Sequence, residues 1–178
     1  MAQTMENEVT GTDPYLKNFE RFEHQTNQPA WLFPLRKAGI ACFAEQGFPT
    51  LKDEDWRFTR VAPISQLAFN LPEETPSSLK KDDLQAFFLP CVACRLVFVN
   101  GRYAPEISDK NQLSVGVEAG NLANGILNNP KVVEAYLGRY VDTQRDSFCS
   151  LNTAFFEDGG YIRIAGGTIL EAPIHLLF

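Results

Sequence analysis

The pattern of apolar residues changes at Asp158-Gly159-Gly160, and this change constrains the fold more than any other feature of the chain. Before this turn, apolar residues recur at helical spacing in several segments. After it, short apolar runs are separated by Gly166-Gly167 and by Pro173. A period of about 3.6 residues predicts helices, whereas short runs broken by glycine and proline predict strands. We therefore expect an α+β fold in which helices come first and strands come last.

Capping and breaking residues place the expected helices. One helix is expected over residues 13–25, where Pro14 suits the first turn, and a second over residues 30–46, which Gly47 ends. Three side chains of the second helix share one apolar stripe, with Phe43 beside it: Leu35, Ala38 and Cys42. Later helices are expected at 79–88, after Asn129-Pro130 with a buried face of Val133, Leu137 and Tyr140, and from Ser147 to Phe155.

β-branched and aromatic residues place the expected strands. Residues 95–99 form an apolar run that ends at Asn100-Gly101, which is typical of a hairpin turn because both residues tolerate positive φ. The chain is expected to return as a strand at Arg102-Tyr103. Alternation over residues 113–118 predicts a third, half-buried strand. Further short strands are expected at 161–164, 169–170 and 173–178.

The composition is that of a folded protein with an excess of acidic residues. The 178 residues include 16 Lys and Arg against 22 Asp and Glu, so the net charge is −6. This charge, without a basic stripe, disfavours nucleic-acid binding. No apolar run reaches the ~18 residues of a membrane span, and the polar start does not resemble a secretory signal. Four cysteines with one close pair do not predict a disulfide framework, so a reducing compartment fits best.

Cys91-Val92-Ala93-Cys94 is the candidate motif for metal or redox chemistry. A structural zinc site needs four ligands, and without a second such motif Cys42 and Cys149 would have to supply the rest. A redox pair needs a helix N-terminus to activate its first thiol, whereas this pair follows Pro90 and leads into a strand. We favour two structural cysteines at the entry of a buried strand, with a metal or redox role as the alternative.

Neither histidine nor the acidic run predicts a catalytic centre. His24 lies among glutamates on the first helix, and His175 lies between two apolar strand residues. A structural role is favoured for both histidines, with a base or ligand role as the alternative. Asp53-Glu54-Asp55 has basic neighbours on both sides and is expected to form a charge-balanced surface loop. Because phosphate-loop, dinucleotide and serine-elbow motifs are also absent from the sequence, no active site is visible.

Three segments resemble one known family. They are residues 47–59 (GFPTLKDEDWRFT), Phe98-Val99-Asn100-Gly101, and residues 151–164 (LNTAFFEDGGYIRI) with a continuation through Glu171 to Leu176. Their order and spacing resemble the N-terminal part of the SufD branch of the SufB/SufD family, which belongs to the Suf iron–sulfur cluster assembly system. The first segment distinguishes SufD from SufB, and the resemblance covers most of residues 30–178.

The resemblance implies a fold and a division of the chain. SufD proteins have an N-terminal helical region, a central right-handed parallel β-helix and a C-terminal helical region. We therefore expect a disordered tail over 1–12, a helical domain with a small β-hairpin or sheet over 13–157, and the first turn of a truncated β-helix over 158–178.

Seven motif residues are expected to have structural roles: Trp56, Arg57, Asn152, Asp158, Gly159, Glu171 and Pro173. Trp56 is expected to anchor its loop onto the helices, and Asp158 with Gly159 to shape the turn into the first strand. Asn152 is expected to hydrogen-bond the backbone at that junction.

The resemblance also implies a role. SufD is a non-enzymatic scaffold that works with SufB and the ATPase SufC, and clusters are assembled on the SufB–SufD pair. We expect this chain to be the front part of such a scaffold, without catalytic residues, metal ligands or a cofactor of its own, while the full complex handles the iron–sulfur cluster. SufB- and SufC-like partners would bind through regions beyond these residues. The bacterial cytoplasm is the expected location, with the plastid stroma as the alternative.

Two other classes of function stay open. One is a thiol or metal redox enzyme that uses Cys91 and Cys94 together with His175. The other is a stand-alone interaction module that docks through a Phe-rich surface, because the chain has 14 phenylalanines. Separately, residues 161–178 are expected either to pair with a second copy of the chain or to be poorly ordered, since an unpaired strand edge recruits other chains.

Overall fold

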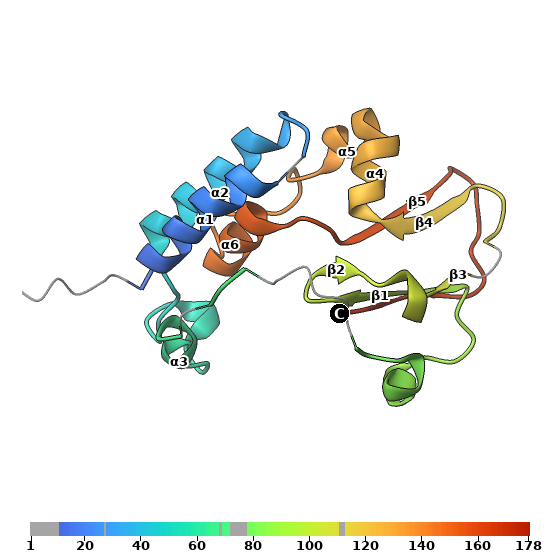
Figure 1. Ribbon diagram of the computed structural model, residues 1–178, viewed down its shortest axis with the longest axis horizontal. Coiled ribbons are helices and arrows are strands. Elements are labelled where there is room, and N and C mark those ends of the chain that lie inside the picture. The colour runs from blue at the N-terminus through green and yellow to red at the C-terminus, as the bar shows by residue number, and fades with distance from the viewer. Residues whose placement is uncertain (1–10, 27, 68, 72–77, 111–112) are drawn as a thin grey trace, which may run out of the picture. The chain divides into compact units, whose positions relative to one another are not determined.

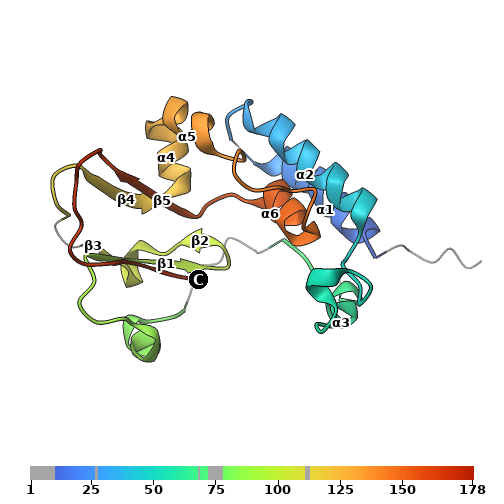
Figure 2. The same ribbon diagram turned by 180° about the vertical axis from the view of Figure 1, so that it is seen from behind.

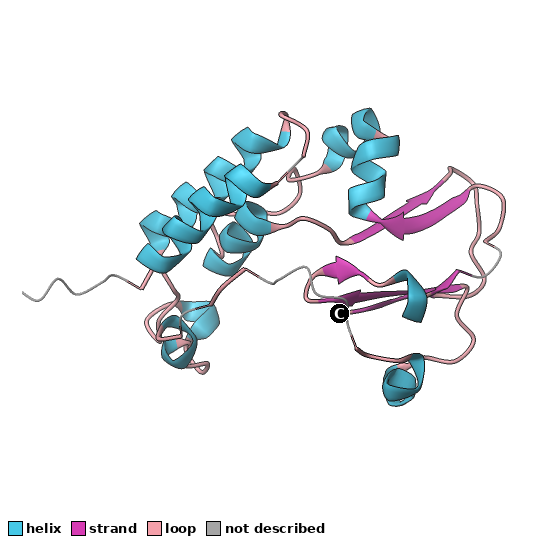
Figure 3. Ribbon diagram, in the orientation of Figure 1, coloured by secondary structure: helices cyan, strands magenta, loops and turns pink. Residues whose placement is uncertain are grey.

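The computed structural model describes residues 11–26, 28–67, 69–71, 78–110 and 113–178, so most of the expected tail over 1–12 lies outside the described residues. The chain divides into two compact units. Unit 1 comprises Met1–Leu71 and Leu137–Phe155, and unit 2 comprises Pro72–Tyr136 and Phe156–Phe178. In the described residues, unit 1 consists of helices and loops, whereas unit 2 holds the strands (Figure 3). The expected α+β class is confirmed.

Three helices form the body of unit 1 (Figure 1). They are α1 (Asp13–Gln25), α2 (Leu32–Gln46) and α6 (Ser147–Phe155). Two short elements, η1 (Glu54–Trp56) and α3 (Ala62–Ser65), lie in the connection that follows α2. Helix α1 has a proline in its first turn, and Gly47 follows α2 with a φ of 68°. The bounds of α1 and the end of α2 agree with the expectation, because residues next to a helix end decide where it stops, whereas α2 begins at Leu32 rather than at residue 30.

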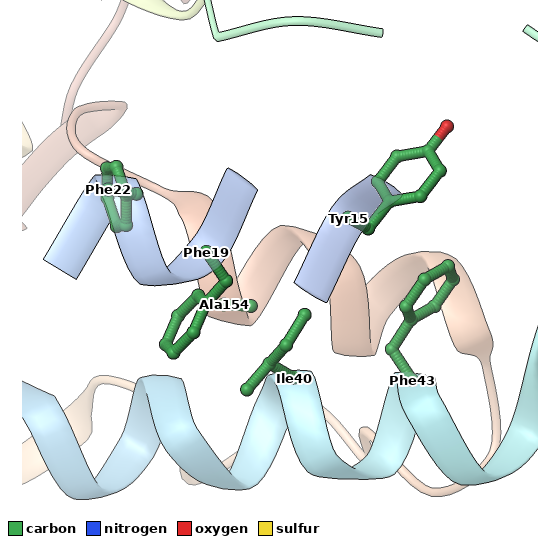
Figure 4. Packing of buried hydrophobic residues seen from close by; sticks show 6 residues of the cluster. All are labelled: Tyr15, Phe19, Phe22, Ile40, Phe43 and Ala154. Atoms are coloured by element: carbon green, nitrogen blue, oxygen red, sulfur yellow. The ribbon is translucent and has the colours of Figure 1, made fainter. Parts of the chain in front are cut away.

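An aromatic cluster holds the three helices of unit 1 together (Figure 4). It comprises Tyr15, Phe19 and Phe22 of α1, Ile40 and Phe43 of α2, and Ala154 of α6. The rings of Tyr15 and Phe43 meet edge to face, with their centroids 5.5 Å apart. Burying each large apolar side chain contributes about 1.5–3 kcal/mol, so this cluster is the core of unit 1.

The buried face of α2 differs from the expected stripe. Ala38 is exposed, whereas Leu35 and Cys42 are half-buried. The fully buried residues of the helix are Leu32, Arg36, Gly39, Ile40 and Phe43. The expectation was wrong because it left out an arginine and a glycine. The Arg36 guanidinium lies 4.8 Å from the centre of the Phe22 ring and also bonds the Gln28 side chain, which allows its burial.

Gly39 brings α2 and α6 into close contact. A Cβ at this position would lie 2.8 Å from the Ser150 carbonyl oxygen and 2.9 Å from the Ala154 amide nitrogen. Helix α6 itself begins under a cap from Asp146, whose Oδ1 accepts the Phe148 N–H at 2.7 Å. The two helices therefore approach at a distance that only glycine permits at position 39.

Unit 2 contains a sheet built around β1 (Cys94–Val99), visible from both sides in Figures 1 and 2. Strand β1 pairs antiparallel with β2 (Arg102–Tyr103) and β3 (Asp109–Lys110), and parallel with β6 (Ile174–Leu177). The turn between β1 and β2 has positive φ at Asn100 and Gly101, as the sequence predicts. Strand β1 has partners on both edges, and its side chains Leu96, Val97 and Phe98 are buried.

The second sheet of unit 2 pairs β4 (Val117–Asn121) antiparallel with β5 (Gly160–Ile164). Two short helices, α4 (Leu122–Asn128) and α5 (Pro130–Tyr136), follow β4. Two 3₁₀ helices complete the unit: η2 (Lys81–Phe87) precedes β1 in the sequence, and η3 (Pro105–Ile107) precedes β3. None of the described helices is long and apolar enough to cross a membrane.

Several expectations for unit 2 were wrong. The strand expected at 113–118 begins only at Val117, because Gly116 adopts a φ of 87° and turns the chain, which leaves Val115 98% exposed. Helix α4 was not expected, although Asn121 at its N-cap is a residue type that favours a helix start. Residues 169–170 do not form a strand. Val133 of α5 is buried as expected, whereas Tyr140 lies beyond the end of α5, in unit 1, and is exposed.

Candidate functional site

The Asp158 carboxylate gathers three hydrogen-bond donors of unit 2. Its Oδ2 accepts the Tyr103 backbone N–H at 3.0 Å, and its Oδ1 accepts the Ala123 N–H at 2.9 Å. The Asn121 amide nitrogen lies 3.1 and 3.2 Å from the two carboxylate oxygens. Ala123 belongs to the first turn of α4, so Asp158 supplies that helix with a cap from a distant part of the chain.

The residues on either side of Asp158 also bond to the segments that its carboxylate joins, and we call this region the Asp158 junction. The Gly159 carbonyl oxygen accepts the Leu122 N–H at 2.7 Å. On the other side, Glu157 forms an ion pair with Arg102 at 2.9 Å. Residues 157–159 therefore connect β2, the end of β4 and the start of α4. With three donors on its two oxygens, the Asp158 carboxylate is arranged to hold these elements together.

A second polar cluster of unit 2 surrounds Arg95 on β1. Its Nη2 donates to the Leu89 carbonyl oxygen at 2.9 Å, and its guanidinium lies 3.8 Å from the centre of the Phe88 ring. Its Nε donates to Nδ1 of His175 at 3.4 Å, and its Nη1 pairs with Asp109. A buried guanidinium is tolerated only with such partners, so Arg95 ties the segment after η2 to the sheet.

His175 has a structural neighbourhood. Its Nδ1 accepts from Arg95, so the neutral ring carries its proton on Nε2. The side chain is 9% exposed, and the residue pairs with Arg95 in the parallel register of β1 and β6. Asp109 also pairs with Lys81 of η2. This arrangement supports the structural role favoured for His175. His24, by contrast, is exposed at the end of α1.

The cysteines do not share one environment. Cys91 is exposed and has a φ of 55°, whereas Cys94 is the first residue of β1 and is 1% exposed. Cys42 and Cys149 are half-buried in unit 1. Burial, and secondarily the Asp146 carboxylate, raises the pKa of the Cys149 thiol. Within the described ranges, no three His, Cys, Asp or Glu side chains come close enough to hold a metal ion.

The first motif segment presents both a half-buried and an exposed aromatic ring. Trp56 is half-buried, and its ring centroid lies 5.2 Å from that of Phe148 on α6. Arg57 is exposed, and its guanidinium lies 5.3 Å from the centre of the Phe58 ring, which is itself 91% exposed. The Trp56 contact is the kind of anchor that the sequence predicts for this loop.

The acidic run after Leu51 is engaged locally. The Asp53 carboxylate accepts the backbone N–H of Thr50 at 2.6 Å and its hydroxyl at 3.0 Å, and these bonds lower the pKa of Asp53. The Asp55 carboxylate forms an exposed ion pair with the Arg145 guanidinium at 3.7 Å. Residues 53–55 are exposed, as the sequence predicts from the basic residues beside them.

The remaining motif residues lie at the surface. Asn152 and Glu171 are exposed, and neither side chain bonds to another part of the chain that the structure describes. Pro173 is exposed directly before β6, and its carbonyl oxygen accepts the Ala93 N–H at 2.8 Å. Of the seven motif residues, Asp158 and Gly159 lie in one junction, and the others are dispersed.

Sequence reasoning assigned no special role to Arg95, Asp109 and Asn121. One signal was available for Arg95, because a single charge inside an apolar strand must find partners when that strand is buried on both sides. Asp109 and Asn121 carried no such signal, since their partners lie 14 and 37 residues away in the sequence.

The clusters around Asp158 and Arg95 define a class of protein region: an α+β module in which buried and half-buried polar groups connect strands, helices and loops. The family described as "SufBD protein N-terminal region" matches residues 10–176. An "iron-sulfur cluster assembly SufBD family protein" of Synechocystis sp. is 33% identical over 131 residues, which is 73% of this chain and 28% of the relative. The chain therefore belongs to the SufBD family and corresponds to its N-terminal region. It spans little more than a quarter of the length of this relative.

Proposed function

We propose that this chain is part of a non-catalytic scaffold, of the SufD branch, in a Suf-type iron–sulfur cluster assembly complex. The observation that carries the proposal is the family match over residues 10–176. The printed description of the Synechocystis relative, an iron–sulfur cluster assembly protein, supports it. The clusters around Asp158 and Arg95 are compatible with a scaffold, because both connect elements of structure.

The proposed partners are SufB- and SufC-like proteins. Because the chain spans 28% of its relative, we assign the partner contacts to regions beyond these residues. The iron–sulfur cluster is cargo of the whole complex in this proposal, and no ligand for it is assigned here. The proposed location is the bacterial cytoplasm, with the plastid stroma as the alternative.

We also propose that β6 against β1 is the first parallel contact of a right-handed β-helix. The two strands pair in parallel over four residues, from Cys94 with Ile174 to Val97 with Leu177. Parallel pairing of neighbouring strands is the arrangement that the coils of such a helix require. Strand β5 pairs antiparallel with β4, so it would belong to the segment that leads into the coils.

Co-purification tests the scaffold proposal. The full-length product is expressed together with an affinity-tagged SufB-like protein and a SufC-like protein, and a tagged unrelated α+β protein serves as the control bait. The expected result is a stoichiometric complex with the Suf-type bait only. Recovery of the product in equal amounts from both baits, or from neither, would contradict the proposal.

A second candidate function rests on exposed phenylalanines. Phe58, Phe69, Phe87 and Phe178 each expose nearly half or more of their surface. Exposed aromatic residues are typical of protein interaction sites, so a stand-alone interaction module is the runner-up. The same experiment separates the two candidates, because a stand-alone module would not form a stoichiometric complex with the Suf-type partners.

A further inference from the structure

The dipeptide Asn-Gly occurs twice in the sequence, both times in unit 2 and in two different kinds of structure. Asn100-Gly101 forms the tip of the hairpin between β1 and β2, whereas Asn124-Gly125 lies inside α4 (Figure 1). Asparagine loses its side-chain amide most readily before glycine, because glycine has no Cβ to shield its backbone nitrogen. The two dipeptides therefore share the same intrinsic reactivity, and the surrounding structure decides which of them reacts.

The hairpin tip leaves the reacting groups of Asn100 and Gly101 accessible. Both residues are exposed, and a Cβ at Gly101 would meet no other part of the described chain within 4 Å. The ladder pairs Val99 with Arg102, so the two tip residues lie beyond the paired positions of β1 and β2. Their φ values of 51° and 78° are those of a two-residue turn, whose N–H groups do not belong to the ladder. The Gly101 nitrogen is thus open to a base and to the Asn100 side chain.

Helix α4 shields the corresponding atoms of Asn124 and Gly125. The Asn124 side chain is exposed, but Gly125 is buried. A Cβ at Gly125 would lie 2.9 Å from two atoms of the Tyr161 ring, so this ring covers the backbone at that position. Because Gly125 lies past the first turn of the helix, helical geometry directs its N–H toward the carbonyl four residues earlier. Attack by this nitrogen on the Asn124 side chain requires α4 to open first.

We propose that Asn100 is a site of spontaneous deamidation and that the fold protects Asn124 from the same reaction. The Gly101 nitrogen loses its proton to a base and attacks Cγ of Asn100, so that the new N–Cγ bond closes a succinimide ring. The bond between Cγ and Nδ2 breaks, and the side-chain nitrogen takes up that proton and leaves as ammonia. Water then adds to one of the two ring carbonyls and opens the ring. The net reaction converts an amide and water into a carboxylic acid and ammonia.

One of the two products lengthens the backbone inside the turn. When water attacks the backbone carbonyl of the ring, the chain continues through Cβ and Cγ of residue 100 as isoaspartate, which adds an atom to the backbone. A two-residue hairpin sets the register of its strands, so the extra atom shifts or strains the pairing. That register brings Arg102 to Glu157 and the Tyr103 N–H to Asp158. Deamidation at the hairpin tip therefore loosens the Asp158 junction.

Peptide mapping by mass spectrometry during storage of the folded protein at neutral pH tests the proposal. Asn100 is expected to lose its amide at least about tenfold faster than Asn124, since an opening free energy of about 1.4 kcal/mol in α4 already slows the reaction by that factor. The matched control is the same chain unfolded in urea, where the two dipeptides should react at similar rates. The measurement needs no partner protein, so its outcome does not depend on the scaffold proposal.

Hydrogen exchange measures the effect on the junction. Protein with isoaspartate at residue 100 is detected by an isoaspartate-specific methyltransferase with labelled S-adenosylmethionine, and its Tyr103 amide should exchange faster than in fresh protein. Asn100→Asp carries the same charge on a backbone of normal length and should leave this exchange unchanged.

Three results would overturn the proposal: no measurable amide loss at Asn100 in the folded protein, equal loss at Asn100 and Asn124, or a difference that persists unchanged in urea. Unchanged exchange of the Tyr103 amide in the isoaspartate form would overturn the link between the hairpin tip and the Asp158 junction.

Discussion

Replacing Asp158 by alanine should destabilise unit 2 strongly. The change removes the acceptor of three donors: the backbone N–H groups of Tyr103 and Ala123, and the side-chain amide of Asn121. A hydrogen bond to a charged acceptor contributes about 1.5–3 kcal/mol, and the half-buried position of Asp158 favours the lower end. Because Tyr103 and Ala123 are half-buried, water can replace part of the lost bonding, so we expect a loss of about 3–5 kcal/mol.

The conservative variant sharpens this prediction. Asp158→Asn keeps the shape of the side chain and one acceptor oxygen. It replaces the other oxygen with an NH₂ group that faces hydrogen-bond donors, and it removes the negative charge. The expected loss is about 2–3 kcal/mol, between those of wild type and Asp158→Ala. Glu171→Ala is the control, because Glu171 is an exposed carboxylate and should change stability by less than about 0.5 kcal/mol.

Urea denaturation measures the loss, and hydrogen exchange locates it. Because the chain has two compact units, unfolding need not follow a single transition, and the exchange of individual amides shows which unit is affected. The Tyr103 and Ala123 amides should lose protection first. If Asp158→Ala matches Glu171→Ala in stability, and both amides keep their protection, the assignment of Asp158 as the centre of this junction is wrong.

Three further predictions concern other parts of the chain. Gly39→Ala should destabilise unit 1 by about 1–3 kcal/mol in thermal unfolding, because its Cβ would lie 2.8 Å from a carbonyl oxygen of α6; a neutral change contradicts the close packing. A thiol reagent should modify exposed Cys91 rapidly and buried Cys94 only on unfolding, and mass spectrometry measures both rates. Equal modification rates at the two cysteines, or stoichiometric zinc or iron in the purified protein, would support the metal or redox alternative. A carbon-detected NMR titration should show that Asp53 titrates below its ordinary pKa of 3.8. Because its folded-state pKa is lowered, its contribution to stability is present above 3.8 and is lost as the pH falls below that value. A measured pKa at or above 3.8 would contradict the hydrogen bonds from Thr50.

Local signals in the sequence were sufficient for elements whose ends depend on adjacent residues. Pro14 and Gly47 marked helix ends, and Asn100-Gly101 marked the hairpin, because capping and turn conformations involve residues next to one another. The same approach failed at Val115, where alternating apolar residues predicted a strand but Gly116 turns the chain. Alternation describes which side chains could share a face, and it does not say whether a partner strand is there to pair with them.

Burial was harder to predict than secondary structure. The helical pattern of α2 is clear, yet the buried face includes Arg36 and Gly39 rather than Ala38. Arg36 is buried because the ring of Phe22 and the side chain of Gln28 receive its guanidinium. Gly39 is buried because α6, more than 100 residues later, packs against it. A hydrophobicity pattern cannot register either effect.

The sequence by itself determined the α+β class, the main helix ends, the β1–β2 hairpin and, through its motif segments, membership of the SufBD family. The tertiary structure alone decided that Asp158 caps α4, that Arg95 meets His175, and that β6 runs parallel to β1. The physical reason is the range of the interactions. Caps and turns are made by neighbouring residues, whereas these contacts join segments 35 to 80 residues apart, and only the folded chain brings them together.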